Sequence, residues 1–166
     1  MIMNTKTKIV KLSAFKKKIA QLKKTKRKNA FTNGCFDILH MGHVSYLQQA
    51  KKNNRILVVG LNSDRSVKRI KGPNRPVVGE KQRAAILAAL ACVDYVVLFN
   101  EATPLKLIEA VKPDILIKGA DWKKKGIIGS ESVQGHGGKI EYIKFVPGLS
   151  SSNIIERIAK SAKKKR

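Results

Sequence analysis

Short apolar runs alternate along the chain with stretches in which apolar residues recur every three or four positions. The apolar runs predict five strands, at residues 29–33, 56–61, 94–99, 115–117 and 140–145. The helical spacing predicts helices around Val44, Leu47 and Ala50 and at residues 80–92, 104–111 and 153–163. Strands that alternate with helices in this way are typical of a mostly parallel sheet covered by helices on both faces. The pattern therefore predicts an α/β three-layer sandwich with a five-stranded sheet.

A further helical pattern lies ahead of the first strand, in the basic N-terminal arm of residues 1–28. Its apolar positions are Leu12, Phe15, Ile19 and Leu22, with lysines between them. This spacing predicts an amphipathic helix packed on the main domain, with Ser13 as a candidate cap. The chain of 166 residues has no internal repeat and no linker-like stretch, so the sequence predicts a single domain over residues 1–166.

The charge of the chain is strongly basic and unevenly distributed. The formal net charge is +24, from 35 Lys and Arg residues and 11 Asp and Glu residues. The arm and the C-terminal tail, residues 157–166, contain no acidic residue. Basic ends of this kind either bind nucleic acid or another anionic surface, or they reflect the general composition of a Lys-rich proteome. We favour the second interpretation and expect no specific nucleic-acid partner.

Several classes of protein are disfavoured by the sequence. No apolar run approaches the ~20 residues that a membrane span requires, and lysines interrupt the N-terminus where a signal peptide would need an apolar stretch. Cys35 and Cys92 are the two cysteines, and they form no CxxC motif, which disfavours a disulfide scaffold or a cysteine-based zinc module. We therefore expect a cytoplasmic protein without membrane insertion.

Ligands of such folds bind at the carboxyl ends of the strands. Segments rich in Gly, Ser, Asp, Lys and His follow the predicted strands at residues 34–43, 62–64, 118–122 and 147–152. In the first segment, His40 and His43 flank Gly42 where the chain enters a helix. A helix N-terminus attracts anions, and two imidazoles there suit a phosphoryl group whose charge must be stabilised during displacement. A zinc site would need a third ligand, and His136 is the only other histidine, so we expect no metal held by the protein itself.

The segment from Thr32 to His43 resembles the HxGH signature of the nucleotidyltransferase superfamily, and its full string is most similar to the D-glycero-β-D-manno-heptose-1-phosphate adenylyltransferase (ADP-heptose synthase) family. The resemblance continues through residues 62–64, 68–72, 75–77, 82–83, 93–94, 112–114, 118–122 and 150–155. It covers residues 8–158 and implies a Rossmann-like fold. The sequence has neither a P-loop motif nor a GxGxxG motif, which disfavours a P-loop kinase and a nicotinamide-dependent dehydrogenase. Many relatives carry a sugar-kinase domain ahead of this module, and we expect the present chain to be the stand-alone form.

The resemblance also implies a set of site residues. The expected catalytic residues are His40, His43, Lys68 and Lys71, with the two lysines on a mobile loop that follows the departing phosphates. Expected nucleotide or phosphate contacts are Thr32, Asn33, Gly34, Phe36, Gly42, Arg83, Gly119, Asp121, Trp122, Ser150, Ser151 and Ser152. The sugar-phosphate side is expected to include Asp37, Asn62 and Asp64.

Structural alternatives stay open for several of these residues. The lysines would then belong to a solvated turn, Arg83 to an ion pair, the three serines to a helix cap, and Trp122 to the core. Asp37 either orients an imidazole or faces the sugar phosphate.

The reaction that the resemblance implies is transfer of AMP from ATP to heptose 1-phosphate, with Mg²⁺ bridging the triphosphate and pyrophosphate as the leaving group, for lipopolysaccharide core synthesis. The expected partners are the two substrates, a second copy of the chain in a homodimer, and a separate kinase and phosphatase of the same pathway. One alternative is a CTP-dependent cytidylyltransferase that acts on an alcohol phosphate such as glycerol 3-phosphate; the related cytidylyltransferases have an arginine at the position of Phe145, which disfavours it. A more remote alternative is a basic nucleic-acid-binding protein, which would not need two histidines at a helix start.

Overall fold

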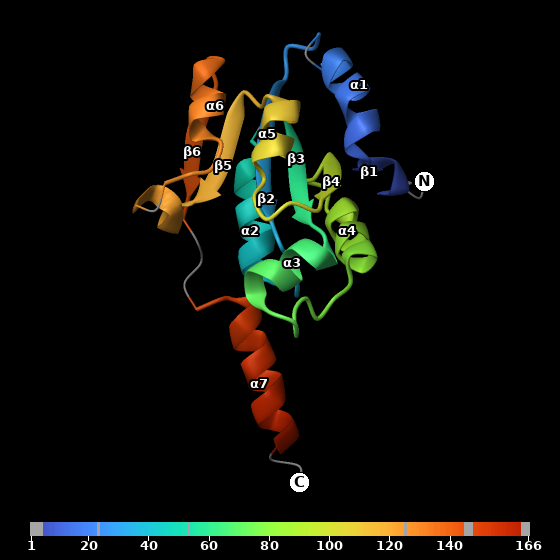
Figure 1. The fold of residues 1–166 in the computed structure, drawn as a ribbon, viewed down its shortest axis with the longest axis vertical. Helices are drawn as coiled ribbons and strands as arrows, with labels where there is room; N and C mark the ends of the chain where they lie inside the picture. Colours follow the sequence, from blue (N-terminus) through green and yellow to red (C-terminus); the bar gives the residue numbers. More distant parts are fainter. Residues whose placement is uncertain (1–4, 23, 53, 125, 145–147, 164–166) are drawn as a thin grey trace.

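The computed structural model describes residues 5–22, 24–52, 54–124, 126–144 and 148–163. At its centre is a sheet of six parallel strands in the order β1-β4-β3-β2-β5-β6 (Figure 1). The strands are β1 (Ile9–Val10), β2 (Lys28–Gly34), β3 (Arg55–Asn62), β4 (Tyr95–Phe99), β5 (Ile115–Gly119) and β6 (Lys139–Ile143). The helices are α1 (Leu12–Leu22), α2 (Met41–Ala50), α3 (Asp64–Lys71), α4 (Glu80–Ala89), α5 (Leu105–Val111), α6 (Ser130–Gly135) and α7 (Ser151–Lys163), with 3-10 helices η1 (Thr5–Lys8) and η2 (Ala120–Lys124).

The five predicted strands are confirmed, with their ends shifted by a few residues, but the prediction of a five-stranded sheet was wrong by one strand. The sixth strand, β1, lies in the N-terminal arm and pairs with β4 through Ile9↔Val96 and Val10↔Val97. Only two residues long, it gives no apolar run that a sequence pattern can distinguish from its surroundings. Its pairing with β4 places the arm at the edge of the sheet.

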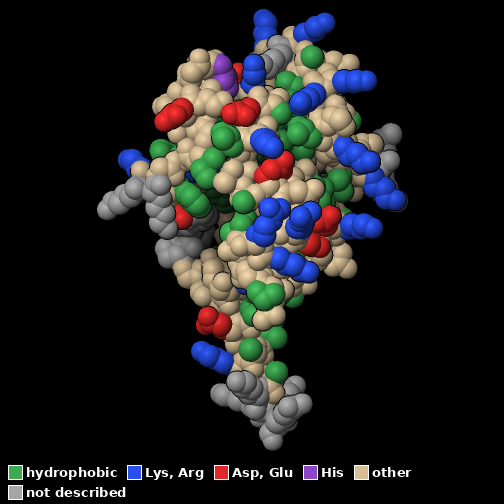
Figure 2. Space-filling view, in the orientation of Figure 1, with side chains coloured by type: hydrophobic (Ala, Val, Ile, Leu, Met, Phe, Trp, Pro, Cys, Tyr) green, Lys and Arg blue, Asp and Glu red, His purple; other side chains and the backbone are tan. Residues whose placement is uncertain are grey.

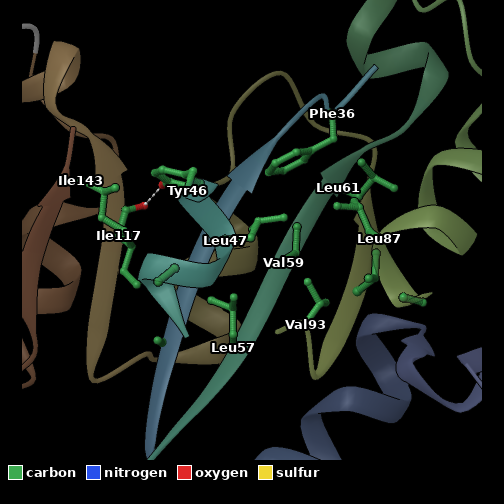
Figure 3. Packing of buried hydrophobic residues seen from close by; sticks show 14 of the residues in the cluster. Phe36, Tyr46, Leu47, Leu57, Val59, Leu61, Leu87, Val93, Ile117 and Ile143 are labelled. Atoms are coloured by element: carbon green, nitrogen blue, oxygen red, sulfur yellow. Dashed lines mark hydrogen bonds between the residues drawn. The ribbon is translucent and has the colours of Figure 1, made fainter. Parts of the chain in front are cut away.

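Alternation along β3 explains the three layers. Leu57, Val59 and Leu61 point to one face, where they pack with residues of α2 and α4 (Figure 3). Ile56 and Val58 point to the other face, where they pack with residues of α1, α5 and α6. All eight residues of β3 are buried, as expected for a central parallel strand covered on both sides. The predicted sandwich is therefore confirmed.

The helices differ from the prediction mainly where their sequences are polar or short. The amphipathic helix of the arm is confirmed as α1, which buries Phe15 and Ile19, but Ser13 lies inside the helix and is not its cap. Two helices were not predicted: α3, which is strongly charged and buries only Ser66 and Val67, and the six-residue α6. Helix α7 projects away from the sheet at the C-terminal end (Figure 1). None of the helices in the described part of the chain is long and apolar enough to cross a membrane.

Candidate active site

The site begins where β2 and β5 stop pairing. Their backbone pairing runs through Ala30↔Ile115 and Phe31↔Leu116. One residue further, the Tyr46 hydroxyl of α2 donates to the Ile117 carbonyl at 3.2 Å and shares a 2.8 Å hydrogen bond with the Thr32 hydroxyl. Figure 3 shows how this side chain reaches across to β5.

Beyond that level, Lys118 Nζ of β5 donates to Asn33 Oδ1 of β2. Side-chain hydrogen bonds thus replace the backbone pairing where the carboxyl ends of β2 and β5 separate. Because β3 and β5 lie on opposite sides of β2, this opening is the point at which the strand order reverses, where α/β sheets bind ligands.

A cavity of about 410 Å³ occupies this opening, and its volume falls within the range of small-molecule sites. Nine predicted site residues line it: Asn33, Gly34, Phe36, Asp37, His43, Asn62, Lys71, Trp122 and Ser151. Seven further residues line it without having been predicted: Cys35, Tyr46, Ile70, Ala102, Pro104, Lys118 and Ile128. The other predicted residues do not line it: Thr32, His40, Gly42, Asp64, Lys68, Arg83, Gly119, Asp121, Ser150 and Ser152.

The two histidines form a stacked pair at the start of α2. Their ring centroids lie 3.9 Å apart, and the His43 ring also packs against Phe36 at 5.1 Å. Burial, together with the nearby His40 and Lys71, lowers the pKa of His43 to about 4, and burial also lowers the pKa of His40. Both imidazoles are therefore neutral at pH 7, and the buried Nδ1 atom of each has no hydrogen-bond partner among the described residues. Buried polar atoms are normally hydrogen-bonded, so this pair is an exception of the kind that functional sites show.

The lysines after β3 lie on a helix, so the prediction of a loop for this segment was wrong. Lys68 and Lys71 belong to the last turn of α3, which ends at Gly72 with a φ of 94°. Val67 and Ile70 are the two apolar residues of this helix, too few to stand out among its charged neighbours. Ser63 caps the helix by accepting a hydrogen bond from the Ser66 backbone N–H at 3.2 Å. Figure 2 shows Lys and Arg side chains gathered over this helix. Of the two lysines, only Lys71 lines the cavity.

The buried carboxylate of Asp37 holds a loop against the cavity. It accepts hydrogen bonds from Arg75 Nε at 2.7 Å and from the backbone N–H groups of Val77 and Val78 at 2.8 and 2.9 Å. Burial acts to raise the pKa of Asp37, but these donors outweigh it and hold the pKa below its ordinary value. The carboxylate therefore positions the loop of residues 75–78, a contact that the sequence did not predict, while Asp37 also lines the cavity.

The guanidinium of Arg83 is buried and donates hydrogen bonds to three acceptors of the protein. It donates to the carbonyls of Val78 and Cys35 and, at 2.7 Å, to Asp64 Oδ1. This is the ion-pair alternative, and it joins the start of α3 to α4. Asn62 instead donates to Ser66 Oγ at 2.9 Å while it lines the cavity.

Lys118 is a cavity residue that the prediction of site residues missed, although it lies in one of the segments singled out after the strands. Its side chain is buried, and its ammonium lies 5.4 Å from the ring centroid of Trp122. Burial lowers the pKa of Lys118 to about 8 against the opposing effect of Asp121. The neighbouring Cys35 also lines the cavity, but burial raises its pKa, so it is a thiol at pH 7.

The serines before α7 divide between the helix cap and the cavity. Ser150 Oγ accepts a hydrogen bond from the Asn153 backbone N–H at 3.1 Å, which is the capping role. Ser151 lines the cavity and donates to the Ile38 carbonyl at 3.0 Å, whereas Ser152 is exposed. Phe145, the residue that bears on the choice of nucleotide, lies outside the described residues.

The parallel sheet is covered by helices on both faces, and the histidine pair lies near the point where the strand order reverses. This arrangement suits phosphate binding and is typical of a nucleotide-binding transferase. Residues 31–157 match the cytidylyltransferase-like family, so the chain belongs to that family and is a nucleotidyltransferase.

Curated relatives agree with this assignment. The chain is 54% identical over 155 residues to the bifunctional protein HldE of Citrifermentans bemidjiense, an alignment that covers 93% of this chain and 32% of that protein. It is 55% identical over 151 residues to HldE of Helicobacter pylori, covering 91% and 32% of the two chains. The chain thus spans about a third of the length of these relatives.

A solved structure shares the fold. The lipopolysaccharide core biosynthesis protein from Thermoplasma volcanium is 30% identical to this chain, with a TM-score of 0.57. The superposition covers 72% of this chain and 96% of that one.

Proposed function

We propose that this protein transfers AMP from ATP to D-glycero-β-D-manno-heptose 1-phosphate, releasing pyrophosphate and forming ADP-heptose. The observation that carries the proposal is the stacked pair of neutral imidazoles at the start of α2, of which His43 lines the cavity. The sequence resemblance to heptose 1-phosphate adenylyltransferases and the identity to HldE proteins support this choice of substrates.

The chemistry requires positioning and charge stabilisation. The acceptor phosphate is already anionic at pH 7, so its oxygen attacks the α-phosphorus of ATP without a general base. Negative charge is then redistributed over the phosphoryl oxygens, and neutral imidazoles donate hydrogen bonds to them. His40 and His43, fixed by stacking and by the start of α2, supply these donors.

The leaving group departs toward the positive side of the cavity. Lys71 lines that side and is matched to the charge of pyrophosphate, and Ser151 adds a hydroxyl near the start of α7. In the part of the chain that the structure describes, no cluster of three His, Cys, Asp or Glu side chains could hold a metal ion. Mg²⁺ would enter with ATP as the MgATP substrate and would supply neutralisation of the phosphate charge.

A substrate panel tests the proposal. Purified protein is incubated with ATP or CTP, each with heptose 1-phosphate or glycerol 3-phosphate, and pyrophosphate release is measured. We expect turnover with ATP and heptose 1-phosphate only, and its loss in the His43→Ala variant used as control. Turnover with CTP and glycerol 3-phosphate instead would establish the cytidylyltransferase alternative.

We further propose that the protein is a cytoplasmic homodimer that receives its substrate from a separate kinase and phosphatase and supplies lipopolysaccharide core synthesis. The projecting α7 has an apolar groove that includes Ile154, Ile158 and Ala162. An antiparallel second copy centred on Ile158 would cover this groove and place Ile154 opposite Ala162, as an isologous contact requires. Light scattering should give twice the 18.4 kDa chain mass; a monomeric mass at micromolar concentration would contradict the dimer.

A further inference from the structure

Lys118 is a buried cation without an anionic partner. Its residue is 7% exposed, and among the described residues no carboxylate lies within ion-pair distance of its ammonium. Buried charges in proteins are normally paired, because an isolated one loses its hydration without compensation. Asp121 acts on it only through a longer-range electrostatic effect.

The contacts of Lys118 hold its ammonium in place without neutralising it. An ammonium group has three N–H donors, and the Asn33 amide oxygen accepts one of them. The Trp122 ring, 5.4 Å away, provides a cation–π contact that offsets part of the lost hydration. Both neighbours are themselves cavity residues, so the cation is fixed at the cavity wall.

The position of Lys118 is matched to an anionic ligand. Among the described residues that line the cavity, Lys71 and Lys118 carry the positive charges, and Lys71 is exposed whereas Lys118 is buried. Lys118 lies on β5 at the point where β5 separates from β2, which is the floor of the opening. A phosphate seated there would meet a cation already stripped of water, and charge-assisted contacts are strongest in such surroundings.

We propose that Lys118 is a phosphate-binding residue, whose ammonium group, held by Asn33 at the floor of the cavity, binds a phosphate oxygen of one of the two substrates. The proposal rests on the proposed function for the identity of these substrates. The same chemistry would be supplied by the triphosphate of ATP or by the phosphate of the sugar, and the experiment separates the two sources.

The test uses Lys118→Met, which keeps the length and apolar body of the side chain and removes the charge. Binding of ATP and of heptose 1-phosphate is measured separately by calorimetry, without turnover, and kcat and KM are then measured with both. We expect Kd and KM for one of the two substrates to rise by about 10- to 100-fold, the effect of a hydrogen bond to a charged group. Lys118→Arg should restore part of this affinity. The substrate that is affected identifies the phosphate.

Lys144→Met is the matched control, because Lys144 follows the neighbouring strand β6 and is exposed. It should leave Kd and KM unchanged. Unchanged Kd and KM for both substrates in Lys118→Met would overturn the proposal, as would a fall in kcat alone. Equal weakening by Lys144→Met would also overturn it, since a general charge effect would then suffice. Wild-type protein without turnover on any substrate pair would instead refute the proposed function, and the binding measurements would still decide the role of Lys118.

Discussion

Gly42 lies between the two histidines, and its lack of a side chain allows their close arrangement. A Cβ atom at this position would lie 3.0 Å from Nδ1 of His40 and 3.3 Å from Cβ of Leu149. Ordinary contacts between such atoms lie at about 3.5–4 Å, so the His40 ring or its neighbours must move by roughly 0.5 Å. Because a misplacement of about 1 Å can reduce a rate by about 10²-fold, we expect Gly42→Ala to lower kcat by about 10-fold.

Stability should change in the opposite direction. Gly42 lies in the first turn of α2 without a left-handed backbone, and alanine stabilises a helix over glycine by up to ~1 kcal/mol. The variant should therefore keep or raise its free energy of unfolding while it loses activity. The assays are urea unfolding and pyrophosphate release with saturating substrates.

Gly135→Ala is the matched control, because a Cβ atom at that position of α6 would meet no atom within 4 Å. It should leave kcat unchanged. A kcat of Gly42→Ala within twofold of wild type would refute the argument that ring placement limits turnover. Loss of both stability and activity would show that the added methyl group disrupts packing instead.

Three further predictions concern the site and its support. His43→Ala should lower kcat by about 10²–10³-fold, the effect of one lost charge-stabilising donor, and an NMR titration of the wild-type His43 ring should have its midpoint near pH 4 instead of 6.5. Lys71→Ala should lower kcat/KM by about 10-fold and Lys68→Ala by much less, since only Lys71 lines the cavity; equal effects would contradict the geometry. Hydrogen bonds from Arg55, and from Lys52, lower the pKa of Glu141 to about 2, against the effect of burial, so Glu141→Gln should lower the unfolding free energy at pH 7 by up to ~3 kcal/mol. That loss should shrink between about pH 5 and pH 2, because protonation then removes the same charge from the wild type.

The sequence by itself determined the class of fold and the location of the site. Apolar runs separated by helical patterns predicted a parallel sheet buried on both faces. In that arrangement the apolar strands and the apolar faces of the helices bury one another. The string from Thr32 to His43 placed two histidines at a strand-to-helix turn, and this local geometry is fixed by neighbours in the chain. The sequence did not reveal β1 or α3, because β1 has two residues and α3 has two apolar positions among charged ones, which is too little pattern to recognise.

Contacts between distant segments were decided only by the tertiary structure. Asp37 binds Arg75, which is 38 positions away in the chain, and Arg83 binds the Cys35 carbonyl, which is 48 positions away. Their roles in holding the loops therefore depend on how those loops fold back. The sequence placed Lys118 in a segment singled out after a strand but gave no sign that its side chain is buried. Lys118 and Asn33 are 85 positions apart in the chain, and they meet only because β5 pairs with β2. This packing buries the ammonium beside Asn33 and makes Lys118 part of the cavity wall. Burial of a charge is a property of the packed molecule, and no local pattern encodes it.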